Sequence, residues 1–263
     1  MAVRVPFGER YLAGRSAIHT ADARVKLPAT LAYIFAVTLT PVGHWPALVL
    51  LALPLVAALA FSGLSPMVVL RRSALALPFI LAAVPLMFTK EGETLFSMPL
   101  LGWTASREGL EAVLSILTKS WLSVVAVVIL TATTPAAELL RAARTLGLPR
   151  LLVATVSFMY RYLFVIGEEA LRLMRARDSR SARLPGHKAG GSLGSRARVL
   201  GNMVGSLFLR TYERSERVYA AMQARGYDGE PRFLWGRAWR LIDVTLAVAL
   251  VAYLSGVEVY ARY

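Results

Sequence analysis

The stretch Glu213-Arg-Ser-Glu-Arg-Val-Tyr-Ala-Ala-Met-Gln-Ala-Arg-Gly-Tyr-Asp-Gly229 decides how the rest of the sequence is interpreted. Its charges are spaced as on a helix, with Glu213 and Arg217 one turn apart, and Gly226 is expected to end that helix. Regions of membrane-spanning composition lie on both sides of it. This arrangement predicts a membrane protein whose working surface is a cytoplasmic docking helix.

The overall composition is that of a helical membrane protein. Of the 263 residues, 56% are hydrophobic and 17% are charged, whereas soluble domains carry about 25% charged residues. The net charge of +14 comes without a zinc-finger, RNP or basic-zipper pattern, so a positive cytoplasmic face explains it better than nucleic-acid binding. The absence of cysteine excludes disulfides, iron–sulfur clusters and a thiol nucleophile.

We expect an all-α, polytopic membrane protein with about five transmembrane helices, because one crossing needs about 20 mostly apolar residues. The stretch Leu151–Ile166 competes as a sixth span. It contains Arg161, and an arginine at mid-span costs about 2.5–3.5 kcal/mol. A helix along the membrane or against the bundle is therefore preferred there. The predicted spans are Leu27–Val42, Trp45–Phe61, Ser73–Phe88, Leu110–Thr134 and Leu241–Val259.

The distribution of Lys and Arg sets the expected orientation. The basic segment Met1–Lys26 has no early apolar core, so it is expected to stay in the mature chain on the cytoplasmic side. Residues 133–240 carry 19 Lys/Arg against 8 Asp/Glu, the strongest cytoplasmic signal. The acidic loop 90–109 is expected outside. The predicted division is 1–134 (N-terminal segment and the first four spans), 135–240 (cytoplasmic helices) and 241–263 (last span), in a prokaryotic cell (inner) membrane.

The cytoplasmic region is expected to be helical. Thr134 as N-cap and Pro135 at the first helical position open one helix, which Gly147 and Pro149 close. A second helix is predicted over 150–180, with a Glu168–Arg172 pair, and a third over 195–225. Leu184–Gly194, rich in Gly, is predicted to be a flexible linker.

Each of the two long helices is predicted to end in an Ala-Arg pair, at Ala176-Arg177 and at Ala224-Arg225. The small Ala allows a partner's backbone to approach, and the guanidinium presents a rigid fork of donors to carboxylates or carbonyls. An arginine at a solvated helix end, near the C-terminal dipole, is the plain alternative. The residues alone favour a partner-binding platform without identifying the partner.

Catalytic, nucleotide and metal sites are not indicated. His19, His44 and His187 lack metal-ligand spacing, and no phosphate-binding loop or nucleophile elbow occurs. We therefore expect no catalytic residue, no metal site and no cofactor in this chain. Asp243 and Lys119 are the ionisable groups expected near membrane depth, and both are interpreted as interfacial anchors.

The sequence resembles the transmembrane T component of energy-coupling factor (ECF) transporters, the CbiQ/EcfT family. Four blocks carry the resemblance over nearly the whole chain, and the last is the most specific. They are His19–Leu27, Leu139-Leu-Arg141 with Leu146-Gly-Leu-Pro149, Tyr160-Arg161-Tyr162 with Glu168-Glu169, and Ala221-Met-Gln-Ala-Arg-Gly-Tyr-Asp-Gly229. The last block and the N-terminal block look most like the cobalt and nickel branch of the family. Within that branch, cobalt is the preferred cargo.

The resemblance implies a non-catalytic scaffold that links two cytoplasmic ABC ATPase subunits, which bind ATP and Mg, to a membrane-embedded substrate-capture (S) subunit. It implies that Ala-Arg-Gly motifs dock into the ATPases. The second motif corresponds to Ala224, Arg225 and Gly226; the first falls at Ala176 and Arg177, with Asp178 in place of Gly, so that Arg177 or Arg180 makes the contact. A nickel-specific or shared vitamin T component is the alternative, and an autonomous channel or carrier is the alternative of a different class.

Overall fold

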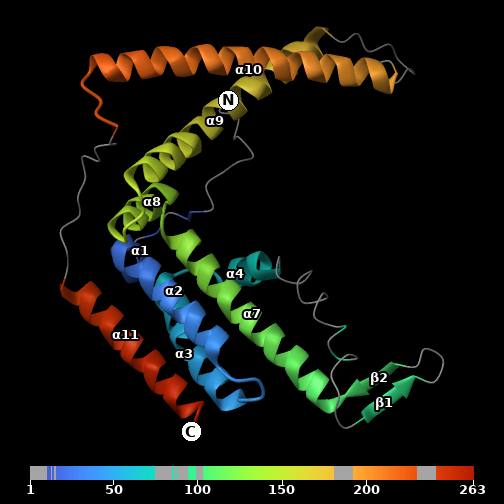
Figure 1. Ribbon diagram of the computed structural model, residues 1–263, viewed down its shortest axis with the longest axis vertical. Coiled ribbons are helices and arrows are strands. Elements are labelled where there is room, and N and C mark those ends of the chain that lie inside the picture. The colour runs from blue at the N-terminus through green and yellow to red at the C-terminus, as the bar shows by residue number, and fades with distance from the viewer. Residues whose placement is uncertain are drawn as a thin grey trace. The chain divides into compact units, whose positions relative to one another are not determined.

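The computed structural model describes residues 11–12, 14, 16–74, 85, 87, 94–98, 103–180, 192–229 and 241–263 (Figure 1). The chain packs as two compact units. We call residues 10–146 and 236–263 the bundle unit, and residues 147–235 the helix-pair unit. Each unit is described by itself.

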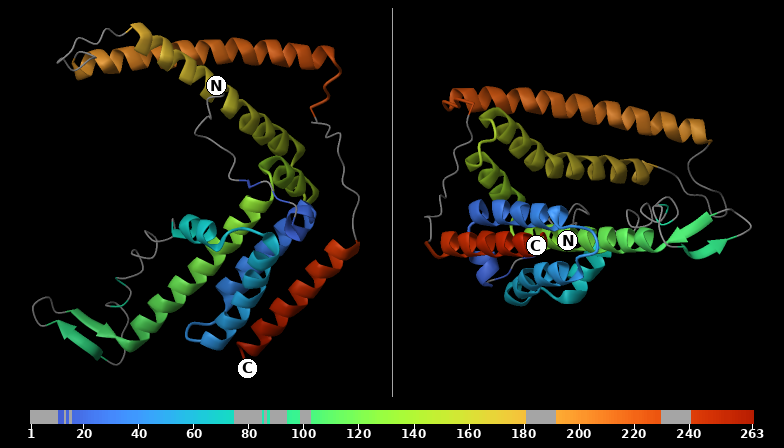
Figure 2. Two further views of the ribbon diagram at one scale, coloured as in Figure 1. Left: turned by 180° about the vertical axis from the view of Figure 1, so that it is seen from behind. Right: turned by 60° about the horizontal axis from the view of Figure 1, so that its bottom comes forward.

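The bundle unit contains seven described helices and one hairpin. The helices are α1 (Ala17–Thr20), α2 (Ala23–Leu39), α3 (Trp45–Ser62), α4 (Pro66–Ser73), α7 (Arg107–Thr133), α8 (Ala136–Thr145) and α11 (Leu241–Tyr260). The hairpin pairs β1 (Thr94–Met98) with β2 (Trp103–Ser106) in antiparallel register. Figures 1 and 2 show α2, α3, α7 and α11 side by side, with the hairpin at the start of α7.

Short polar side chains begin several of these helices. The Asp22 carboxylate accepts the Arg24 backbone N–H at 2.9 Å, and Ser106 Oγ accepts that of Gly109 at 3.0 Å. Such contacts satisfy N–H groups that have no partner in the first helical turn. The chain reverses between α2 and α3 at Gly43, which has a positive φ of 87°. Glycine adopts this conformation readily because it has no Cβ.

Two local predictions are corrected. Thr134 does not cap α8: the N-cap is Pro135, without a side-chain hydrogen bond, and Thr134 is the extended residue that ends α7. The proline ring fixes φ of Pro135 near the value found at this N-cap position, so α8 starts without a polar side-chain cap. The loop predicted over 90–109 contains the hairpin, and its last three residues already belong to α7.

The core of the bundle unit lies between α2, α3, α7 and α11. Val37, Ala47 and Leu51 are fully buried there. Tyr33 Oη donates to the Leu51 carbonyl at 2.9 Å and Tyr253 Oη donates to that of Leu50 at 2.9 Å. Tyrosine hydroxyls thus tie α2 and α11 to α3. Tyr33 is buried, so its hydroxyl needs this partner, whereas Tyr253 is exposed.

Polar contacts between helices define the helix directions. The Asp22 N–H donates to Asp243 Oδ2 at 3.3 Å, and Thr40 Oγ1 donates to Glu258 Oε1 at 2.9 Å. The residue numbers increase in the same direction along both helices from the first pair to the second, so α2 and α11 run parallel. Lys26 Nζ donates to the Thr133 carbonyl at 3.5 Å, so α7 ends where α2 and α11 begin.

Four described helices are long and apolar enough to cross a membrane: α3, α7, α9 (Arg150–Arg180) and α11. Three of them coincide with predicted spans, and α9 contains the competing stretch. The first predicted span corresponds to α2, which has 17 residues. The predicted span Ser73–Phe88 lies almost wholly outside the described residues. The all-α, polytopic class is confirmed.

The helix-pair unit consists of α9 and α10 (Leu193–Ala224). The predicted bounds of α9 are confirmed, and α10 begins two residues earlier than predicted because Ser192 Oγ accepts the Ser195 N–H at 3.3 Å. Gly194 is therefore helical and not part of a linker; the linker's residues 184–191 lie outside the described residues. The two units divide between residues 146 and 147, so α8 packs with the bundle unit. The boundary predicted between residues 134 and 135 concerns the edge of the membrane and stays a prediction.

Candidate docking surface

The end of α10 is built by its own backbone. The Tyr227 N–H donates to the Met222 carbonyl at 3.0 Å, and the Gly226 N–H donates to that of Gln223 at 2.9 Å. These two bonds form a Schellman motif, in which the residue after the cap is left-handed. Gly226 has φ of 78°, so its predicted place as the residue that stops this helix is confirmed.

This motif leaves the predicted docking residues on the surface. Ala224, Arg225 and Gly226 are all exposed. Arg225 is the C-cap residue, so its guanidinium leaves the helix at the negative end of the helix dipole. The arrangement can present a fork of N–H donors to a carboxylate or to carbonyls of another chain.

The corresponding part of α9 is its last turn. Ala176 and Arg180 are exposed and Arg177 is half-buried. Arg177 and Arg180 are three residues apart, so they lie on adjacent positions of one helical face. Ser179 Oγ donates to the Ala176 carbonyl at 2.9 Å. Both arginines can reach one partner surface, which leaves the choice between them open.

The two candidate tips lie at opposite ends of the helix pair. Phe158 of α9 packs edge-to-face on Tyr227, with ring centroids 6.1 Å apart, and Arg210 of α10 reaches Glu169 at 3.2 Å. The pair is therefore antiparallel. About 28 Å of helix separates Phe158 from Arg177 at 1.5 Å per residue. The structure thus offers two separate contact points and not one combined site.

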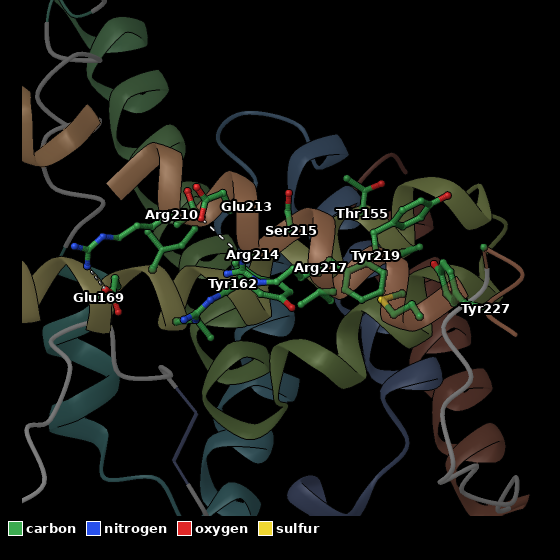
Figure 3. Close-up of a pocket in the computed structure, with 18 of the residues that line it drawn as sticks. Thr155, Tyr162, Glu169, Arg210, Glu213, Arg214, Ser215, Arg217, Tyr219 and Tyr227 are labelled. Carbon is green, nitrogen blue, oxygen red and sulfur yellow. Dashed lines mark hydrogen bonds and ion pairs between the residues drawn. The ribbon is translucent and has the colours of Figure 1, made fainter. Parts of the chain in front are cut away.

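A groove of about 700 Å³ runs between α9 and α10 beside the Arg225 tip. Figure 3 shows Tyr162, Tyr219 and Tyr227 along it, and Arg210 pointing to Glu169. Apolar residues one turn apart form the α9 wall: Leu151, Ala154 and Phe158. Neither this groove nor Phe158 was predicted from the sequence. An aromatic residue directly after a C-terminal Gly, here Tyr227, is the signal that could have found it.

Ion pairs along the two helices are exposed. The predicted pairs are confirmed, with Arg172 3.8 Å from Glu168 and Arg217 3.7 Å from Glu213. Exposed pairs of this kind contribute about 0.2–1 kcal/mol. They support the helices without fixing the tertiary arrangement.

Large apolar side chains also face outward on both helices. No residue of α10 is buried, and α9 buries only Val153 and Ala154. Exposed apolar area of this extent marks a surface that contacts protein or lipid. The exposed side chains include Leu151, Met159, Leu163, Val204, Phe208 and Leu209.

The other ionisable groups singled out in the sequence lie in the bundle unit. Asp243 accepts the Asp22 N–H, and Lys119 Nζ donates to the Thr40 carbonyl, so each joins two helices. Glu258, which was not predicted from the sequence, accepts a hydrogen bond from the Thr40 hydroxyl. Thr40 thus contacts both Glu258 and Lys119. Among the described residues no three His, Cys, Asp or Glu side chains are grouped to hold a metal ion.

The comparisons with known proteins cover both units. Residues 14–235 match the protein family described as CbiQ, cobalt transport protein. The chain is 30% identical over 190 residues to the energy-coupling factor transporter transmembrane protein EcfT of Exiguobacterium sibiricum, covering 68% of this chain and 69% of that protein.

Two further relatives match this chain over very different lengths. The EcfT of Listeria innocua is 29% identical over 273 residues, covering 96% of this chain and 97% of that protein. The nickel permease LarQ of Lactiplantibacillus plantarum is 30% identical over 123 residues, covering 46% of this chain and 42% of that protein. This chain spans less than half of the length of LarQ and of several other relatives that it matches.

Proposed function

The chain belongs to the CbiQ cobalt transport protein family, and from that membership we propose that it is the transmembrane scaffold of an ECF-type importer of cobalt ions. Its partners are two cytoplasmic ABC ATPase subunits and a membrane-embedded capture subunit. The ATPases bind ATP and Mg and carry out hydrolysis. The capture subunit binds the metal, and this chain, which is no enzyme and holds no cofactor, transmits movement between them.

The observation that carries this proposal is the exposed arginine tip at the end of α10. Arg225 stands at a helix end that the Gly226 turn keeps clear, and the tip at Arg177 and Arg180 lies at the far end of the pair. Two tips about 28 Å or more apart along the helices suit two copies of a partner. We propose that Ala176, Arg177 or Arg180, Ala224, Arg225 and Gly226 dock the two ATPases.

The directions of the bundle helices support placing α9 on one side of the membrane. Since α7 ends and α11 begins at the same end of the bundle unit, the chain between them crosses an even number of times. In the described part of this region α9 is the one candidate crossing. The undescribed stretches 181–191 and 230–240 have 11 residues each, and a crossing needs about 20.

A return crossing by α10 is unfavourable because that helix carries several arginines, each costly at mid-membrane. They are Arg196, Arg198, Arg210, Arg214 and Arg217. We therefore assign both long helices to the face at which α2 begins. The excess of Lys and Arg in residues 133–240 makes that face cytoplasmic. The N-terminus lies on the same side, in the cell (inner) membrane.

In this mechanism ATP-driven closure of the ATPase dimer displaces the two tips. The displacement moves α9 and α10, whose outward apolar side chains contact the capture subunit. That movement tilts the capture subunit and releases its metal inward. The energy comes from the binding and hydrolysis of ATP by the partners, so the scaffold needs only two arrangements of its long helices.

Nickel is the second candidate cargo, and the similarity to the nickel permease LarQ favours it over the vitamins. The choice between cobalt and nickel lies with the capture subunit, because this chain offers no metal-ligand group among its described residues. Uptake of Co²⁺ against Ni²⁺ by the complete complex decides it.

The test is purification of the tagged chain from its own host, with identification of the bound subunits, followed by reconstitution into liposomes. We expect two ATPase subunits and one capture protein, and ATP-dependent Co²⁺ uptake by the complete complex. The chain alone should move no Co²⁺. Flux through the chain alone would establish an autonomous channel or carrier and contradict the proposal.

A further inference from the structure

The Arg225 tip is joined to α9 by one aromatic contact. Directly after the Schellman turn, the ring of Tyr227 packs edge-to-face on Phe158, at a centroid distance of 6.1 Å and an interplanar angle of 78°. Both rings are half-buried and line the groove between the helices, together with Met222. Figure 3 shows Tyr227 in this groove. Edge-to-face pairing is a preferred arrangement of two aromatic rings.

This contact lies close to the N-terminal end of α9, which we call its root. Phe158 is nine residues from Pro149, about 13 Å along α9. The Tyr227 ring thus contacts α9 near its root, two residues after Arg225 in the sequence.

The ion pair between α9 and α10 lies farther from the tip. Arg210, 15 residues before Arg225 on α10, reaches Glu169 at 3.2 Å. At 1.5 Å per residue, that distance is about 22 Å along the helix. Of these two contacts, the aromatic one is therefore the better placed to carry a displacement of Arg225 to α9.

We propose that Tyr227 is a positioning residue that makes α9 follow the Arg225 tip. When the ATPase displaces Arg225, the rigid Schellman turn carries Tyr227 with it, and the ring pushes Phe158 and the root of α9. The inference rests on the proposed function. It separates docking, which belongs to Arg225, from transmission, which belongs to the Tyr227–Phe158 contact.

The test uses the complete complex and compares Tyr227→Ala with Tyr227→Phe. For Tyr227→Ala we expect the ATPases to co-purify and to hydrolyse ATP, while Co²⁺ taken up per ATP hydrolysed falls about fivefold, the factor that corresponds to an aromatic pair worth about 1 kcal/mol. Tyr227→Phe keeps the ring and should behave as the unmodified chain. Unchanged coupling in Tyr227→Ala, loss of the ATPases from it, or an equal defect in Tyr227→Phe would overturn the inference.

Tyr212→Ala is the matched control, because Tyr212 stacks on Phe208 of its own helix at 6.4 Å and does not bridge to α9. It should leave coupling unchanged. Arg225→Glu in the same assay distinguishes docking of the ATPases from transmission through the Tyr227–Phe158 contact. If the ATPases still bind to it, the docking proposal fails, whatever Tyr227 does.

A second experiment covers the case in which Tyr227→Ala does not fold. Phe158→Ala removes the partner ring on α9 and leaves Tyr227 and the Arg225 tip unchanged. Co²⁺ uptake per ATP should fall as for Tyr227→Ala, while the ATPases still co-purify. Unchanged coupling in this variant would contradict a mechanical role of this contact.

Discussion

The two units of the chain differ in what holds them together. The bundle unit has fully buried side chains such as Val37, Ala47 and Leu51, and hydrogen bonds between helices far apart in the sequence. In the helix-pair unit, α9 and α10 have 31 and 32 residues, yet only Val153 and Ala154 are buried. Packing density of this kind decides which parts of a protein open most easily.

The difference teaches that the two units have different tasks. A unit with its own core keeps its shape when partners come and go. A pair of long helices with few mutual contacts needs partners to complete its burial, and it can be moved by them at low cost. The first two of the following predictions compare a change in one unit with a matched change in the other, and the last two concern the helix-pair unit.

The largest expected effect is on the core of the bundle unit. Leu51→Ala removes a fully buried side chain and should lower the free energy of unfolding by about 3 kcal/mol. Leu209→Ala, on a 62% exposed residue of α10, should change it by less than about 0.5 kcal/mol. Thermal unfolding of the purified chain in detergent measures both. Similar losses at the two positions would mean that the helix pair has a core of its own.

The next effect concerns polar contacts between helices. Thr40→Val removes the hydroxyl that donates to Oε1 of the half-buried Glu258, whose Oε2 lies 3.8 Å from Arg262 and has no hydrogen-bond partner. Removing the hydrogen bond to this charged group should cost about 2 kcal/mol. Thr155→Val is the control, because its exposed hydroxyl bonds only to Leu151 of its own helix. The unfolding temperature should fall for the first variant and stay unchanged for the second.

Glycine positions give a smaller effect, of opposite sign at two sites of α10. Gly226→Ala places a Cβ on a residue with φ of 78° and should cost about 1 kcal/mol, because the left-handed conformation disfavours a side chain. Gly205→Ala, inside the helix and with open space around the new Cβ, should stabilise by about 1 kcal/mol. Hydrogen exchange of the 222–227 amides reports the first change. Equal protection in both variants would contradict the assigned role of Gly226.

The smallest effect is expected from the ion pairs. Glu213→Gln breaks an exposed pair with Arg217, at 3.7 Å, and should cost about 0.3–0.5 kcal/mol. Raising the salt concentration should reduce this difference further. A loss above about 1 kcal/mol, measured by the unfolding midpoint, would show that the pair has a structural role that its exposure does not indicate.

Local signals in the sequence predicted local structure well. Pro149 before α9 and Gly226 after α10 mark helix ends because each acts through its own backbone, and the pair Glu213–Arg217 is fixed by helical spacing. Thr134 misled because Pro135 already fixes the entry to α8. The hairpin of β1 and β2 was interpreted as a loop, because strands of five and four residues are too short to show a clear alternation of apolar and polar residues.

Tertiary contacts could not be predicted from a single sequence. Nothing near Thr40 indicates Glu258, and nothing near Tyr227 indicates Phe158, because each pair is brought together by helices distant along the chain. The same holds for α9, whose composition suits a membrane span. The directions of α2, α7 and α11 support the proposal that α9 does not cross, because a single crossing there would leave the start of α11 at the opposite end of the bundle unit.

The central claim is that arginines at the ends of α9 and α10 bind the ATPase subunits. The direct test is co-purification of those subunits with Arg177→Glu combined with Arg225→Glu. The control is Arg210→Glu combined with Arg214→Glu, which reverses two charges in the middle of α10. We predict that the first variant inserts into the membrane and loses the ATPases, at a cost of about 2 kcal/mol or more for each tip, whereas the second retains them. ATPases bound to both variants, with uptake intact, would contradict the account.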